Sequence, residues 1–474
     1  MLGVKVALLT LGCDKNTVDS ERYLAELVAH GAVPTARADE AEVILVNTCG
    51  FIDAAKQESI DALVGAGRLK ADGACQAVVA VGCMVQRHKA ELEEALPEVD
   101  LFLGASEVDQ LVPRLAERGL VLSDPLAEHP GVRLYGGELP HVRYLKVSEG
   151  CDHGCAFCAI PLMRGRHRSF AVADVVREAQ LLELQGAREV NLVAQDLAHY
   201  GRDRRDGVRL PDLLGALLAE TSVAWYRNLY LYPTGITPRL LEVVAESPRV
   251  VRYLDMPIQH ASDAVLARMR RPERVKTMRE KLRRFRDAVP GVAIRTTCIV
   301  GFPGETEADF EALCDFLEEA RFDRVGAFAY SPQEGTRAYA MADDVPEVVK
   351  RDRLERLVER QRAITAERYE ERVGERTTVL VDRAGEGGGP GQPRLAQARA
   401  PWQADDVDGV TWVATDAPAG TFVEVEVDEV VDDYDFRATA VAPVVPLARR
   451  RLGRLLPMAG AAPAVASSIG SYGR

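Results

Sequence analysis

The sequence contains no long apolar run, and no stretch approaches the roughly 18 apolar residues that a membrane-spanning helix needs. Aromatic residues make up only 6% of the chain, while apolar residues reach 47% and charged residues 28%, which excludes a disordered protein. Basic residues are also scarce, since 59 Lys and Arg face 72 Asp and Glu, a net charge of −13. Such a chain repels phosphate backbones unless basic residues gather locally. A cationic partner is therefore favoured over nucleic acid, and no membrane association is expected.

The first residues lack the features of an export signal. Residues 9–13 superficially resemble a lipoprotein signal, but the apolar stretch is short and Lys5 lies inside it rather than before it. We therefore expect a cytoplasmic protein. In a reducing compartment its nine cysteines favour metal binding or catalysis over disulfides.

At 474 residues the chain is long enough for about three domains. Residues 1–135 alternate β-branched runs with helical patterns, which predicts strands at 4–11, 43–46 and 78–81 and helices at 20–30 and 53–63. This alternation indicates a doubly wound α/β domain. A cysteine follows each predicted strand, at Cys13, Cys49 and Cys83. Because the carboxyl ends of parallel strands share one edge of a sheet, the three thiols could converge.

Residues 136–371 repeat the β/α alternation, which predicts strands at 142–147, 189–194, 228–231, 251–255, 293–300 and 324–329. Six units in this length indicate a partial (β/α)6 barrel, followed by a long charged helix that begins at Pro346. Residues 372–443 change to short alternating segments and predict a small antiparallel β-barrel. Residues 444–474 are mostly small or apolar and are expected to form a mobile tail.

The densest group of cysteines directly follows the first predicted barrel strand. Cys151, Cys155 and Cys158 form a Cx3Cx2C pattern. Three thiolates so close in sequence can wrap one corner of an iron–sulfur cubane, which normally takes four cysteines, so one iron stays open. An open coordination position is the mark of substrate binding. A zinc site would more naturally show two CxxC pairs, and a ferredoxin would show CxxCxxC with a fourth cysteine before proline.

Two structural alternatives accompany this motif. The three thiols could be unrelated buried residues, and His153 inside the loop is expected to be solvated rather than a ligand. Further polar residues and glycines follow other predicted barrel strands, at Gln195, Asp255, Arg295, Gly301 and Gly304. Glycines let a backbone approach a ligand, and Thr306 could cap the next helix. Equally, Gln195 and Arg295 could satisfy the backbone, and the glycine turn could be an ordinary strand–turn–helix connection.

A Cx3Cx2C loop after the first strand of a β/α barrel resembles the radical S-adenosylmethionine superfamily. The resemblance implies a 4Fe-4S cluster on Cys151, Cys155 and Cys158, whose open iron chelates S-adenosyl-L-methionine. Electron transfer from the cluster breaks the sulfonium bond and gives a 5′-deoxyadenosyl radical, chemistry that side chains alone do not perform. In that family the strand ends and the glycine turn line the cofactor. This implies cofactor contacts for the five residues named above, Gln195, Asp255, Arg295, Gly301 and Gly304.

The upstream cysteines are interpreted as a second cluster site. Singly, Cys13, Cys49 and Cys83 could each be a small buried hydrophobic residue. Three cysteines at successive strand ends favour a second 4Fe-4S cluster with one open iron. The remaining cysteines lack such company and are predicted to be core thiols: Cys75, Cys298 and Cys314.

Two three-cysteine sites, an α/β domain, a radical barrel and a terminal β-barrel together resemble the methylthiotransferases over about residues 1–443. The resemblance rests on residues 10–13, 47–49, 81–83, 149–158 and 299–306, and the last domain resembles the module called TRAM. One branch of these enzymes modifies an adenosine in transfer RNA. The other, RimO, modifies an aspartate of small-subunit ribosomal protein twelve, and residues 159–169, 193–196, 230–233 and 433–435 look like RimO.

The charge of the last domain agrees with the RimO branch. Residues 372–441 hold six basic and fourteen acidic residues, whereas an RNA-binding module should show a basic patch. An acidic barrel suits a basic ribosomal protein, although it could also be merely a solvated face.

The resemblance implies two S-adenosylmethionine molecules, one as methyl donor and one as radical source. It also implies methylthio transfer to the aspartate β-carbon and a low-potential electron donor such as flavodoxin or ferredoxin. Transfer RNA as acceptor remains the alternative within the family, and a noncatalytic iron–sulfur electron carrier or scaffold is the alternative of another class.

Overall fold

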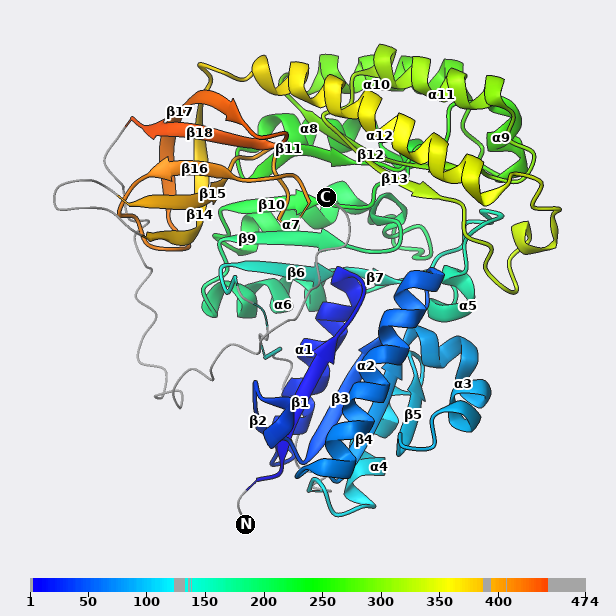
Figure 1. Cartoon of the computed structure of the whole chain (residues 1–474). Helices are drawn as coiled ribbons and strands as arrows, with labels where there is room; N and C mark the ends of the chain where they lie inside the picture. Colours follow the sequence, from blue (N-terminus) through cyan, green and yellow to red (C-terminus); the bar gives the residue numbers. More distant parts are fainter. Residues whose placement is uncertain are drawn as a thin grey trace.

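The computed structural model describes residues 3–122, 133–134, 137, 139–386, 394–405 and 407–441. Figure 1 shows three sheet-based units in chain order, coloured blue, green and orange. The predicted tail, residues 444–474, lies outside the described residues. Within the described part of the chain, no helix is both long enough and apolar enough to cross a bilayer.

The first unit is a parallel five-stranded sheet in the order β2-β1-β3-β4-β5. Its central strands are buried along their whole length, as expected for a parallel sheet covered on both faces. Helices α1 and α4 contribute to the core on one face, and α2 and α3 to the core on the other. The elements are β1 (Lys5–Thr10), α1 (Asp14–Ala29), β2 (Val33–Pro34), β3 (Val43–Thr48), α2 (Asp53–Asp72), β4 (Ala77–Gly82), α3 (Cys83–Ala95), β5 (Leu101–Gly104) and α4 (Leu111–Ala116).

The second unit is a six-stranded parallel sheet whose strands keep their chain order, β6-β9-β10-β11-β12-β13. Its helices pack apolar side chains against the strands in one continuous core. The strands are β6 (Val142–Lys146), β9 (Glu189–Val193), β10 (Trp225–Asn228), β11 (Val250–Asp255), β12 (Ala293–Val300) and β13 (Arg324–Ala329). The helices are α5 (Ile160–Arg164), α6 (Val172–Leu184), α7 (Leu210–Glu220), α8 (Pro238–Glu246), α9 (Asp263–Arg268), α10 (Val275–Ala288) and α11 (Glu307–Ala320). A separate pair joins β7 (Ser148–Glu149) to β8 (Arg168–Ser169).

The long charged helix α12 (Glu347–Glu370) leads from this barrel to the third unit, a closed five-stranded barrel in the order β14-β15-β16-β18-β17. Four of its strand pairings are antiparallel, whereas β16 pairs parallel with β18. Its strands are β14 (Arg376–Glu386), β15 (Leu395–Arg399), β16 (Thr411–Ala414), β17 (Phe422–Val431) and β18 (Asp435–Ala440). The predicted fold class is confirmed for all three units.

The third unit packs against the amino-terminal ends of the central strands. Its core is continuous with residues at or near the starts of those strands, including Val142, Trp225, Val251 and Ala293. The cysteine loop, in contrast, follows β6 and β7 at the carboxyl end of the central sheet. In Figure 1 the orange barrel and the α5 segment accordingly lie at opposite ends of the green unit. The terminal barrel therefore lies away from the end that holds the cysteine loop.

Candidate active site

The three upstream cysteines lie where strands of the first sheet end. Cys49 directly follows β3, Cys83 directly follows β4, and Cys13 lies just before α1. Burial raises the pKa of the Cys49 thiol to about 12, and the neighbouring charges of Cys13 and Cys83 add to the rise. Gly12, at φ +90°, brings its backbone so close that an added Cβ would lie 2.8 Å from the Cys49 Sγ. The strand topology thus brings the three thiols together.

The loop cysteines form a second group beyond β7. Burial raises the pKa of Cys158 to about 12 and that of Cys151 to about 11, and neighbouring loop thiols add to both rises. Backbone bonds hold the loop on other segments, since the Ala156 N–H donates to the Met269 carbonyl at 2.9 Å. Gly150, at φ +80°, permits a contact in which an added Cβ would lie 2.1 Å from the Arg166 carbonyl oxygen.

The two groups fit soft-metal clusters by their chemistry. All six cysteines are free of disulfides, and thiolates are the ligands of iron–sulfur clusters. Each group supplies three thiols, one fewer than a closed cluster takes. Near the carboxyl end of the central sheet, Gln195 Oε1 and Gln259 Oε1 are buried acceptors that no described group satisfies. Buried acceptors without a partner are groups that a polar small-molecule cofactor could use.

Three of the predicted cofactor residues lie in two separate hydrogen-bond networks, Gln195 in one and Asp255 with Arg295 in the other. Gln195 donates to Glu149 Oε1 at 2.8 Å, just before the cysteine loop. Asp255 and Arg295 pair with each other at 3.1 Å, and the Asp255 carboxylate also accepts from the Tyr230 N–H. The Tyr230 hydroxyl in turn donates to Asp14, the residue after Cys13, at 2.9 Å. Through Tyr230 this pair is therefore linked to the residue that follows Cys13.

In the glycine turn, the backbone N–H groups of Gly301 and Gly304 already have hydrogen-bond partners within the chain. The Gly301 N–H donates to the Glu305 carboxylate at 2.9 Å, and the Gly304 N–H donates to Asp344 at 2.6 Å. Thr306 caps α11 as predicted, because its hydroxyl accepts from the Asp309 N–H at 3.2 Å. Cofactor contact by Gly301 or Gly304 stays a prediction.

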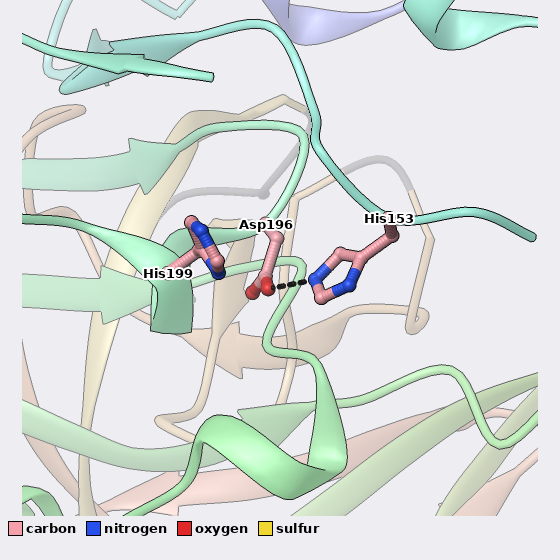
Figure 2. A group of neighbouring side chains, drawn as sticks. All are labelled: His153, Asp196 and His199. Atoms are coloured by element: carbon pink, nitrogen blue, oxygen red, sulfur yellow. Dashed lines mark hydrogen bonds and ion pairs between the residues drawn. The ribbon is translucent and has the colours of Figure 1, made fainter. Parts of the chain in front are cut away.

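His153 corrects the expectation of a solvated loop residue. Its Nε2 lies 2.7 Å from Asp196 Oδ2, its ring stacks on Tyr232 at 4.0 Å, and its side chain is 26% exposed. Figure 2 shows His153 and Asp196 joined by this bond, with His199 beside them. The three offer ligand atoms within 4.8 Å of one another. Sequence reasoning missed the group because His153, inside the cysteine motif, lies 43 positions from Asp196, and no sequence pattern joins that motif to the segment of Asp196 and His199.

The Asp196 carboxylate already has partners within the chain. Its Oδ1 accepts from the backbone N–H groups of Ala198 and Tyr232 at 2.9 and 3.1 Å. Burial lowers the pKa of His199, and its neighbour His167 lowers it further, so the imidazole is neutral near pH 7. The group therefore anchors the cysteine loop to the ends of β9 and β10.

The three remaining cysteines are core thiols, as predicted. Cys75 is 7% exposed, and Cys298 and Cys314 are both fully buried in the described structure.

Three family models match the chain. The uncharacterised protein family UPF0004 matches residues 5–104, the radical SAM superfamily matches residues 145–317, and the TRAM domain matches residues 373–441. Ribosomal protein uS12 methylthiotransferase RimO of Anaeromyxobacter sp. (strain Fw109-5) is 45% identical over 457 residues, which cover 95% of this chain and 96% of that protein. The protein of the same name from Desulforudis audaxviator is 44% identical, over 92% of this chain and 97% of its own. The chain belongs to the RimO family of radical S-adenosylmethionine methylthiotransferases.

Membership in the RimO family makes the chain an enzyme of the radical S-adenosylmethionine class. It implies a 4Fe-4S cluster and S-adenosylmethionine as cofactors. The solved radical S-adenosylmethionine methyltransferase TsrM from Kitasatospora setae is 14% identical, with a TM-score of 0.50 over 82% of this chain and 79% of its own. That likeness concerns the fold alone. The resemblance drawn from the cysteine motifs and the terminal barrel is confirmed for the family.

Proposed function

We propose that this RimO family member methylthiolates the β-carbon of an aspartate in ribosomal protein uS12. Relatives that are named ribosomal protein uS12 methylthiotransferase match along 92–95% of the chain. The observation that carries the proposal is the proximity of the two thiol groups. Cys83 packs against Ala159 and Met163, which follow Cys158 within five residues. A radical site and a sulfur-carrying site so close together suit transfer of a methylthio group to one carbon.

Cys151, Cys155 and Cys158 would hold one 4Fe-4S cluster, and Cys13, Cys49 and Cys83 a second. When bound and reduced, the first cluster with S-adenosylmethionine supplies a 5′-deoxyadenosyl radical for hydrogen abstraction. We propose a second S-adenosylmethionine as methyl donor, and a flavodoxin or ferredoxin as the low-potential electron donor. The proposed cofactor contacts are Gln195, Asp255, Arg295, Gly301 and Gly304.

The proposed division of labour follows three domains, residues 1–135, 136–371 and 372–443. The first would hold the upstream cluster, the second the radical cluster and cofactor, and the third would attract the substrate. An acidic terminal barrel attracts a basic ribosomal protein and repels RNA, which supports the protein acceptor over transfer RNA.

Parallel assays with two acceptors test this function. Reconstituted enzyme, S-adenosylmethionine and a reductant are given recombinant uS12 in one reaction and transfer RNA in the other, and the product masses are read. We expect the mass gain of one methylthio group on an aspartate of uS12 and no change in the RNA. Modification of an adenosine with an untouched aspartate would instead establish the transfer-RNA alternative.

Two cysteine variants separate the proposed roles of the clusters. Cys155→Ala should lower the iron content by about half and stop 5′-deoxyadenosine production, because one of two clusters loses a ligand. Cys49→Ala should also lose about half of the iron but keep producing 5′-deoxyadenosine without methylthio transfer. Cys75→Ala is the control, since this cysteine is as buried as Cys49 but lies outside both groups. Full product formation by Cys49→Ala would return the upstream cysteines to a structural role.

A further inference from the structure

One short helix joins the two cysteine groups. Helix α5 begins two residues after Cys158 and ends at Arg164. Its side packs on the start of α3, where Cys83, Ala159 and Met163 form one apolar contact. The segment that leaves the loop cysteines therefore ends against an upstream cysteine.

Arg164 makes a direct contact with that cysteine. Its Nε donates to the Cys83 Sγ at 3.1 Å, and its side chain is 6% exposed. The rest of the guanidinium is fixed by Nη1 on Asp19 Oδ2 at 2.6 Å and Nη2 on Asn16 Oδ1 at 2.5 Å. Because a guanidinium is planar, bonds at both Nη atoms fix the direction in which Nε points. The contact with the sulfur is thus imposed by its neighbours.

The charge of Arg164 is permanent in this site. A guanidinium stays protonated in proteins, and the carboxylates of Asp19 and Glu149 lie 2.6 and 3.4 Å from Arg164 Nη1. Burial acts to raise the pKa of Asp19, whereas Lys146 and Arg164 hold it at about 2. The carboxylates of Asp19 and Glu149 balance the two cations Lys146 and Arg164 before the charge of any thiolate is added.

The same network reaches the loop cysteines. Glu149 Oε2 lies 3.4 Å from Arg164 Nη1 and 2.6 Å from Lys146 Nζ, and Glu149 is separated from Cys151 by one residue. Its other oxygen accepts from Gln195. A continuous chain of partly buried polar contacts therefore runs from the carboxyl end of β9 past the loop cysteines to Cys83.

We propose that Arg164 is a positioning residue for the upstream cluster, which donates a hydrogen bond to the Cys83 sulfur and raises the reduction potential of that cluster. The proposal rests on the upstream cluster of the proposed function. Reduction adds one electron to the cluster without forming or breaking a bond, and the reduced state carries more negative charge on its sulfurs. A fixed cation and a hydrogen bond at a ligand sulfur stabilise that state.

A potentiometric titration with dithionite, followed by electron paramagnetic resonance, tests the proposal in the full-length chain. The parent protein carries Cys151→Ala, Cys155→Ala and Cys158→Ala, so that its signal comes from the upstream cluster alone. Arg164→Gln should shift the reduction equilibrium at least tenfold towards the oxidised form, about 59 mV more negative for one electron. Arg166→Gln is the matched control, because that side chain is 92% exposed and lies two residues away.

Three results would overturn the role of Arg164. The first is a potential in Arg164→Gln equal to that of Arg166→Gln. If Arg164→Gln holds no cluster, Arg164→Lys provides the measurement, because it keeps the charge but loses the directed Nε bond. Its potential should also fall below the control, and an equal value is the second overturning result. The third is a parent protein that holds no iron–sulfur cluster with Arg164 intact, which would remove the upstream cluster from the proposed function as well.

Discussion

Replacing Glu189 by Gln should loosen the terminal barrel from the central barrel. Glu189, at the start of β9, is fully buried between two arginines, 2.7 Å from Arg227 Nε and 2.7 Å from Arg399 Nη2. Burial acts to raise its pKa, but Arg399 and Arg227 outweigh burial and lower it. Arg399 also pairs with Asp382 at 2.6 Å, whereas removal of the Glu189 charge leaves the buried Arg227 without its carboxylate partner. Breaking a buried ion pair in this way costs about 3–5 kcal/mol.

Tryptophan fluorescence during urea denaturation measures this loss of stability at the junction between the central and terminal barrels. Of the three tryptophans in the chain, Trp225 and Trp402 lie in the apolar core at this junction, and Trp412 lies on β16 of the terminal barrel. The Trp225 ring contacts Phe422 of the terminal barrel at 4.9 Å. With a slope of about 2 kcal/mol per M, the midpoint of the fluorescence transition should fall by about 2 M urea.

The control for Glu189→Gln is Glu242→Gln, at an exposed position on α8. Its midpoint should match the wild type. If Glu189→Gln unfolded at the same urea concentration as this control, the ion network would contribute nothing to the docking of the terminal barrel, and the reasoning from burial would be refuted.

Three further predictions concern charge and pH. Glu424→Lys, on the exposed face of β17, should weaken binding of uS12 most at low salt, whereas Glu242→Lys on the central barrel should not; titrations at two salt concentrations compare them. The pKa of Asp19 is about 2 in the folded chain and about 3.9 when unfolded. Ionised Asp19 therefore contributes about 2 kcal/mol to the free energy of unfolding. This contribution is present above about pH 4 and is lost as the pH falls through about 2. Asp19→Asn should therefore lower stability at pH 7 but not at pH 2, as acid and urea denaturation would reveal. The pKa of Cys49 is about 12, so binding of Co²⁺ by the apoprotein must displace the proton of this thiol. For this thiol, the affinity for Co²⁺ should therefore rise up to about tenfold per pH unit between pH 7 and 9. A pH-independent affinity would contradict that assignment.

Much of the fold follows from the sequence, and the exceptions have local causes. The strands predicted at 293–300 and 324–329 match β12 and β13. The strand predicted at 228–231 is displaced, since β10 is Trp225–Asn228. Tyr230 adopts φ +61°, and its N–H donates to Asp255, so the apolar run 229–231 leaves the sheet. Periodicity alone cannot show such a turn, because it reports apolar character rather than the sign of φ.

The candidate site also combines features that the sequence predicts with features that it does not. Convergence of Cys13, Cys49 and Cys83 was predictable, because parallel strands place their carboxyl ends at one edge. The environment of His153 was not, because its partner Asp196 lies 43 positions away and reaches it only through the tertiary fold. The contact between Arg164 and Cys83 depends on the packing of α5 against α3, which no sequence pattern specifies.

The chain order of the central strands has a consequence for folding during synthesis. Each strand pairs with a neighbour made just before it, and such local contacts form early. Polar contacts at the amino-terminal end of the barrel cannot form so early, because their partners come much later in the chain. Asn191 donates to Asp405, 214 positions later, and Glu189 pairs with Arg399 of β15. A nascent chain therefore holds a nearly complete barrel whose charged base stays uncovered until the last domain emerges. Release of a product truncated before β14 would leave that base permanently exposed to the cell's quality-control machinery.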